Sequence, residues 1–190
     1  MTLNSATLLI RSAMSQSSHG LKIKAEFVAK DKDGNLIGKS VIENDKALIA
    51  LQAWLRQALF ADVTESAAVL DIAGAPQNIA ADTGITVVGM MAGATIAVPA
   101  FTANAIAGYA AGGSYDATAV TVVASAANVF TVTALFTNST LGDLVYGTAG
   151  LTATGSTGTF LFTGDEVNGA GGYTISTLGT LSATLTVTLT

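Results

Sequence analysis

Residues 181–190 read LSATLTVTLT, a segment in which apolar and hydroxyl side chains alternate without interruption. Leucine, alanine or valine occupies every odd position, and serine or threonine occupies every even one. Successive side chains of a β-strand point to opposite faces, so this pattern predicts a strand with one face on a core and one toward solvent. Threonine suits such a strand because its branched side chain packs well on a pleated surface.

Residues 129–138 alternate similarly, and six other short segments are predicted strands divided by turns. Short strands at regular spacing are typical of an antiparallel sandwich or barrel. We therefore predict a mainly β protein with an antiparallel β-sandwich that is jelly-roll-like. The predicted strands are residues 85–89, 95–101, 117–124, 129–138, 144–148, 159–163, 173–177 and 181–190.

A β-hairpin is predicted near the N-terminal end. Apolar residues alternate with mostly charged ones over residues 21–30, and residues 36–42 form the returning strand. Between them, Asp33 and Gly34 supply the positive φ of a tight turn. Asp31 and Asp33 also suggest a weak divalent-cation site as an alternative, although Gly34 and the later glutamate do not fall where an EF-hand loop requires them.

An apolar helix follows, capped by Asn44 or Asp45 and ending near Ala61. Its polar side chains form only a thin strip, and a helix that is apolar almost all round is buried on most sides. It is shorter than the roughly 20 residues that span a bilayer. We expect it to pack against the hairpin or against another subunit.

The chain thus divides into four predicted regions. Serine-rich residues 1–20 form an N-terminal arm, which the next subunit would hold in place in an assembly. Residues 21–62, the hairpin plus helix, form an assembly and anchor region. Residues 63–84 are a connector, and residues 85–190 form the β-sandwich domain.

Charge is scarce and unevenly distributed. Only 11% of the residues are charged, against about 25% in a typical soluble domain. All eight basic residues lie at or before Arg56, where the net charge is +3, and the remaining residues carry eight acids and no base. The early charges are either ordinary solvated side chains or a surface that docks on an acidic neighbour. Because the β domain has no lysine to protect its sheet edges, we expect subunit packing and a homo-oligomer.

The sequence favours no enzymatic chemistry. It has no cysteine, and its one histidine, His19, lies in the predicted arm. Asp165 and Glu166 are adjacent on a predicted turn, which suits solvation or a weak divalent-cation site but not a glycosidase cleft. We expect no cofactor and no metal. An acidic domain with few aromatics also disfavours nucleic acid, and no segment predicts a membrane span.

The order of parts resembles small virion structural proteins of tailed viruses, such as head decoration or cement proteins and minor capsid or tail proteins. The resemblance is carried by a charged strand with an Asp-Gly turn, an apolar helix and a Gly/Thr-rich β domain. Within that domain lie the Phe-Thr-Val and Phe-Thr-Asn motifs of residues 130–138 and the Leu-x-Val-x-Leu motif of residues 185–189. It implies a non-catalytic protein of the virion, assembled in the host cytoplasm, whose partners are other copies and a major capsid or tail protein.

An alternative is an extracellular filament subunit, pilus-like and joined by strand donation. A carbohydrate-binding sandwich is disfavoured because the single tryptophan lies in the helix. The predicted subunit contacts are apolar residues of the arm and the helix: Leu8, Leu9, Ile10, Leu48, Leu51, Trp54, Leu55, Leu59 and Phe60.

Overall fold

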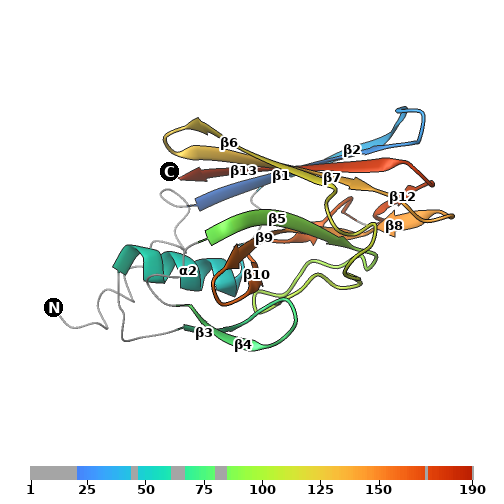
Figure 1. Cartoon of the computed structure of the whole chain (residues 1–190). Coiled ribbons are helices and arrows are strands. Elements are labelled where there is room, and N and C mark those ends of the chain that lie inside the picture. The colour runs from blue at the N-terminus through green and yellow to red at the C-terminus, as the bar shows by residue number, and fades with distance from the viewer. Residues whose placement is uncertain (1–20, 44–46, 61–66, 80–84, 170, 190) are drawn as a thin grey trace.

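The computed structural model describes residues 21–43, 47–60, 67–79, 85–169 and 171–189. Within these ranges the chain is mainly β, with antiparallel sheets arranged as a β-sandwich (Figure 1). The prediction of a mainly β, antiparallel sandwich is confirmed. The one helix described is α2, Ile49–Phe60, which begins later than the predicted cap.

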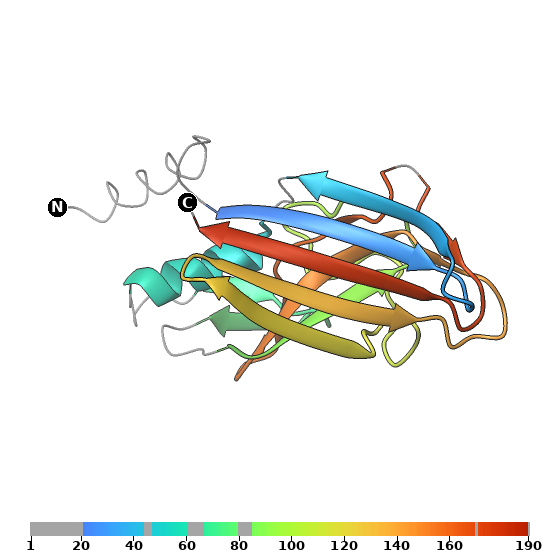
Figure 2. The same ribbon diagram turned by 90° about the horizontal axis from the view of Figure 1, so that it is seen from above.

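The larger sheet has five strands in the order β2–β1–β13–β7–β6, and β2 and β6 are its two edges (Figure 2). Every neighbouring pair is antiparallel. The strands are β1 Leu21–Lys30, β2 Leu36–Glu43, β6 Ala119–Ala126, β7 Val129–Thr137 and β13 Thr180–Leu189.

The predicted hairpin is not a region apart from the sandwich. Strand β1 pairs along its whole length with β13, from Leu21 opposite Leu189 to Lys30 opposite Thr180. Residues 21–62 and residues 85–190 were predicted as separate regions, but both contribute strands to this one sheet. The apolar faces of β1 and β13 belong to the same core. Pairing of the two strands places these faces side by side on that core.

The second sheet is built around β9, Thr148–Gly155, which pairs with β5, Ile85–Gly93, on one side. On its other side lie β10, Thr159–Leu161, and β11, Asp165–Glu166. Only Thr148 of β9 falls in a predicted strand, 144–148, and the rest of β9 falls in a segment for which no strand was predicted. β9 is instead a central strand whose first six residues are buried on both faces. Threonine and glycine alternate with alanine and leucine along most of it, but both faces are buried, so the threonine side does not mark a solvent-exposed face.

The predicted strand at residues 95–101 is wrong. These residues belong to a long connection after β5, and Pro99 within it has no N–H to give to a ladder. The hydroxyl of Thr148 lies 2.6 Å from the carbonyl oxygen of Thr95 and 2.9 Å from that of Ala97. The Thr148 side chain of β9 therefore holds this segment by hydrogen bonds that a neighbouring strand's backbone would otherwise supply.

Two small antiparallel pairs complete the fold. Strand β8, Leu144–Tyr146, pairs with β12, Tyr173–Ile175. Strand β3, Ala67–Leu70, pairs with β4, Pro76–Ile79, inside the predicted connector.

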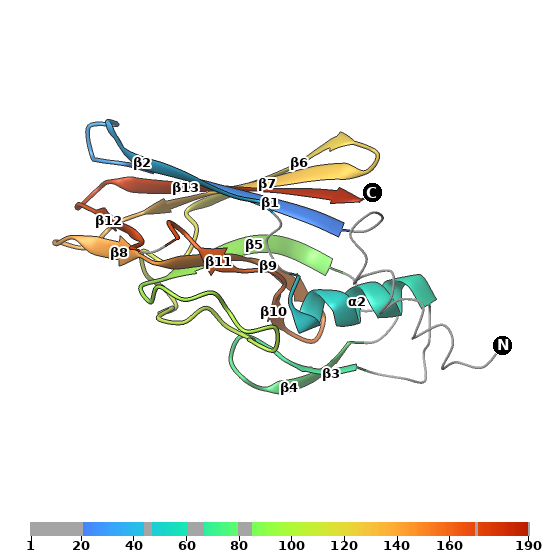
Figure 3. The same cartoon turned by 180° about the vertical axis from the view of Figure 1, so that it is seen from behind.

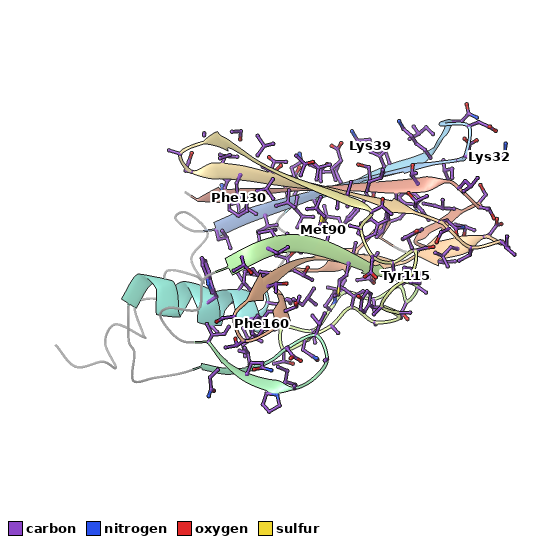
Figure 4. The ribbon with its side chains drawn as sticks, in the orientation of Figure 1. Lys32, Lys39, Met90, Tyr115, Phe130 and Phe160 are labelled. Carbon is purple, nitrogen blue, oxygen red and sulfur yellow. The ribbon has the colours of Figure 1, made fainter. Side chains whose placement is uncertain are left out.

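The main core fills the space between the two sheets. Phe27, Val132 and Phe136 contribute from the larger sheet, and Met90 and Leu151 contribute from the second. Figure 4 shows Met90 on β5 between the sheets. The next residue, Met91, points the opposite way, as alternation along a strand requires.

The other face of the second sheet is also covered. Residues 94–116, helix α2 and the β3–β4 pair lie over it, which makes a third layer (Figures 1 and 3). Met91 packs there in a small buried cluster with Leu48, Ile106 and Leu161. The approach is close at Gly150, where an added Cβ would overlap the backbone oxygen of Thr163. Burial on both faces explains why β9 consists of small residues.

Candidate interaction surface

The described side chains of helix α2, residues 49–54, pack inside their own subunit together with Leu48, which precedes the helix. Leu48 and Leu51 are buried, and the backbone N–H of Leu48 donates to the carbonyl oxygen of Phe162 at 2.8 Å. The ring of Trp54 is half-buried, 6.2 Å from the ring of Phe162. Leu48 and Leu51 therefore stabilise this chain's fold, contrary to the prediction that they contact a neighbour. Leu48 packs in the cluster with Met91, and Leu51 belongs to the main core. The other predicted contacts lie outside the part that the structure describes: Leu8, Leu9 and Ile10, and the side chains of Leu55, Leu59 and Phe60.

The carboxylate of Asp31, a candidate cation ligand, is occupied by its own turn. Its Oδ1 accepts from the backbone N–H of Asp33 at 2.9 Å and of Asn35 at 2.8 Å, and its Oδ2 accepts from the Asn35 amide at 2.9 Å. The Asn35 side chain and N–H hold the pKa of Asp31 below its ordinary value. This geometry favours the turn interpretation over the cation site.

A turn of the same kind lies between β3 and β4, within the predicted connector of residues 63–84. Asp71 Oδ1 accepts from the backbone N–H of Ala73 and of Ala75, each at 2.9 Å, and its Oδ2 accepts from Gln77 at 3.1 Å. The Ala75 N–H is the main cause of a lowered pKa at Asp71. Both turns need a positive φ at a glycine, 85° at Gly34 and 81° at Gly74. Both turns share an Asp-x-x-Gly spacing, from which the turn at Asp71 could have been predicted.

Asp165 and Glu166 lie in the short strand β11, paired with β9, and not on a free turn. Asp165 Oδ1 accepts from the backbone N–H of Glu166 at 2.8 Å. Among the described residues, no three His, Cys, Asp or Glu side chains lie where they could share a metal ion. In the same part of the chain, no helix is long and apolar enough to cross a membrane.

Charge divides the outer face of the larger sheet into two halves. The charged half consists of β1 and β2, where Lys24 Nζ lies 2.7 Å from Glu43 and Lys39 Nζ lies 3.0 Å from Glu26 (Figure 4 labels Lys39). The hydrogen bond with Glu43 raises the pKa of Lys24. The uncharged half consists of β13, β7 and β6, which contain no charged residue. The charge asymmetry of the sequence thus becomes a boundary across one sheet.

Threonines cover much of the uncharged half. Thr184 on β13 is opposite Thr133 on β7, which is opposite Thr121 on β6. The hydroxyl oxygens of Thr133 and Thr184 lie 3.4 Å apart. The surface is polar enough to contact water, yet it carries no charge that would have to lose its hydration in a contact.

The two edges of this sheet differ in the same way. At the β2 edge, Lys39 and Glu43 carry charge, and the Ser40 hydroxyl donates to the carbonyl oxygen of Val167. At the β6 edge, all eight residues are exposed and none is charged. Among the described strands, β6 is hydrogen-bonded only to β7, so one side of its backbone has no strand partner.

Strand β6 also exposes apolar side chains on both of its faces. Val120 and Val122 are opposite Ala134 and Val132, which point into the core, so they belong to the inner face. Both valines remain exposed, because the described part of the second sheet does not cover them. Val123, on the outer face, is 52% exposed. In β proteins generally, an exposed edge strand without charge and with apolar side chains is the kind of edge on which another chain can pair.

A hydrogen bond between a tyrosine and a carboxylate joins two residues of the long connection between β5 and β6. The Tyr109 hydroxyl donates to Asp116 Oδ1 at 2.7 Å, and the N–H of Gly112 donates to Oδ2 at 2.6 Å. Burial, together with the hydrogen bond to Asp116, raises the pKa of Tyr109 to about 12. The same connection exposes Ile96, Val98 and Phe101, a second group of apolar side chains.

The sequence predicted a strand at 117–124, and it contains no lysine in the β domain. Strand β6 has both of these features. Nothing in the sequence indicated that this strand would be an edge, since strand order depends on contacts far apart in the chain. Comparison with known proteins finds no match: no protein-family model, no curated protein and no solved structure.

Proposed function

We propose that this chain is a structural subunit of a virus particle, without catalytic activity, that packs against other copies of itself and a major capsid or tail protein. The observation that carries the proposal is the uncharged half of the larger sheet together with the β6 edge. A soluble monomer usually protects such an edge with lysine or another charge. The unprotected edge of this chain suits a permanent contact.

The composition of the uncharged half matches what a protein contact requires. The buried centre of an interface is depleted of charged residues, because a charge without a partner loses its hydration at a high cost. Threonine hydroxyls such as that of Thr133 exchange water for hydrogen bonds with a neighbour, while Leu135 and Val123 supply apolar area. The charged half, with its internal ion pairs, suits the surface that stays in solvent.

The placement in a virion rests on the resemblance in the order of parts. The two segments that carry it are neighbours in the sheet: Phe130 is opposite Val187 and Phe136 is opposite Leu181. Asn138, at the end of the first segment, is buried, and its amide donates to the carbonyl oxygens of Gly142 and Ile175 at 2.8 Å. These residues build the scaffold that presents the uncharged half.

A filament subunit assembled by strand donation is the second candidate, and the β6 edge is the observation that favours it. Its unpaired backbone could accept a strand from a neighbour, with Val120 and Val122 contributing side-chain contacts. In that case the donor would be a segment such as residues 1–20.

Size-exclusion chromatography with light scattering, followed by negative-stain microscopy of each peak, tests the proposal. We expect closed oligomers that do not elongate. A chain that stays monomeric at every concentration would overturn the proposed assembly. Fibres that become monomers when residues 1–20 are deleted would favour the filament and overturn the virion placement.

A further inference from the structure

We propose that β6 pairs antiparallel with β6 of a second copy about a two-fold axis, so that two five-stranded sheets become one continuous sheet. This inference rests on the proposed function, since it names the partner and geometry of one contact. The axis stands perpendicular to the sheet, which keeps the outer faces of both copies on the same side.

The partner is argued first from charge. The chain has a net charge of −5, so two copies repel each other wherever their acidic surfaces meet. Residues 117–142, which include the whole β6–β7 hairpin, contain no Asp, Glu, Lys or Arg. Two copies that meet at this hairpin bring no like charges into contact, whereas a strongly basic or acidic partner would find no complementary charge there.

The second argument is that β6 is complementary to itself. In an antiparallel pair, directly opposed residues lie on the same face of the sheet. If the axis passes at Thr121, Val120 of each copy is opposite Val122 of the other on the inner face, and Ala119 is opposite Val123 on the outer face. If it passes at Val122, that valine is opposite its own copy. In both registers the opposed side chains are uncharged, and the exposed inner-face valines cover one another.

The third argument is the difference between the two edges. Self-pairing of β2 would bring Lys39 and Glu43 of each copy into the contact, where they already have partners in their own subunit. Val41 on β2 is 43% exposed and Val123 on β6 is 52% exposed, so the edges expose similar apolar side chains and differ in charge. The inference therefore assigns the contact to β6 and not to β2.

The contact is short, which sets its expected strength. The eight residues of β6 span about 27 Å at the rise of an antiparallel strand, and a standard protein interface uses roughly 20–30 residues on each side. We expect a dimer that dissociates on dilution and becomes stable when other contacts of an assembly hold the copies together.

Single-cysteine variants test the geometry, since the chain has no cysteine of its own. T121C and V122C are each incubated with oxidised glutathione, and V41C is the matched control on the opposite edge. Opposed residues of paired strands approach closely enough for a disulfide. We expect a covalent dimer from T121C or V122C and none from V41C. No dimer from either β6 variant, or equal dimer from V41C, overturns the inference.

A charge variant tests the contact without cross-linking. In sedimentation velocity, V123K is expected to lose the concentration-dependent dimer, while V41K keeps it and both retain the wild-type melting temperature. If V123K lowers the melting temperature, T121K replaces it. Dimerisation that survives V123K and T121K overturns the inference. If the wild type then still forms larger oligomers, the proposed function stands; if the wild type is monomeric throughout, both fail.

Discussion

Val41 and Thr121 stand at the two ends of one row of side chains that crosses the larger sheet. The row runs from Val41 through Glu26, Thr184 and Thr133 to Thr121, one residue from each strand. It begins among ion-paired lysines and glutamates and ends at an exposed strand without charge. A single sheet therefore presents one half that suits solvent and one half that suits a neighbouring subunit.

The position of β1 inside the sheet, between β2 and β13, leads to the first prediction. Phe27 on β1 is 1% exposed, whereas Phe101 in the connection after β5 is 48% exposed. We expect Phe27→Ala to lower the free energy of unfolding by about 3–5 kcal/mol, and Phe101→Ala to change it by less than about 1 kcal/mol. Urea denaturation measures both. Equal effects would contradict the placement of β1 in the core.

The contact between β9 and the third layer leads to the second. Gly150→Ala places a Cβ against the backbone oxygen of Thr163, which cannot move as a flexible side chain would. We expect a loss of about 1–3 kcal/mol in the free energy of unfolding. The matched control is Gly142→Ala, where nothing lies within 4 Å of the added Cβ, so the variant should be neutral or slightly stabilising. A tolerated Gly150→Ala would show that residues around Thr163 do not pack on β9.

The turn at Asp71 predicts a pH dependence. Hydrogen bonds from Ala75, Gln77 and Ala73 lower the pKa of Asp71 from its ordinary value of 3.8. A carboxyl group with a lowered pKa in the fold contributes stability that is present above its unfolded pKa and is lost as the pH falls through the folded one. We expect Asp71→Ala to lower the melting temperature at neutral pH, with a difference from wild type that shrinks in acid. A difference that stays constant with pH would contradict this role of the carboxylate.

The Tyr109–Asp116 contact predicts a loss of stability in alkali. The pKa of Tyr109 is raised from 10.0 to about 12, so between these values the unfolded chain has lost the phenol proton and the folded chain retains it. Stability from this group is therefore present below pH 10 and is lost as the pH rises toward 12. In urea denaturation at alkaline pH, Tyr109→Phe should show a shallower decline than wild type. Burial also raises the pKa of Tyr115 and Tyr146, so part of the decline remains. Identical slopes would contradict the assignment to Tyr109.

Local pattern predicted the strands whose two faces meet different environments. β1, β7 and β13 alternate between apolar and polar side chains because one face lies on the core. β9 consists mostly of glycine and other small residues and is buried on both faces, so its segment was expected to form a turn, and β3 and β4 are too short to show a period. The pairing of β1 with β13 joins opposite ends of the chain, and no local pattern contains that information.

The sequence predicted a sheet edge without lysine but not which strand would form it. The absence of lysine after Arg56 indicated a β domain without protected edges, and the structure locates the exposed, uncharged edge at β6. The helix was predicted to pack against its own hairpin or another subunit, because an apolar helix needs cover on most sides, and its leucines were named as candidate subunit contacts. Its own chain provides that cover for Leu48 and Leu51. Periodicity shows that a face is buried, and it does not show by what.

The most direct test of the account is sedimentation velocity of the full chain over a wide concentration range, at low and at high salt. Contacts through the uncharged half involve apolar area and hydrogen bonds, which salt does not screen. Contacts between charged surfaces weaken at high salt, because the Debye length becomes shorter. We predict closed oligomers whose population rises with concentration and which persist at high salt. A monomer at every concentration, or an assembly that dissociates when the salt is raised, would contradict the account.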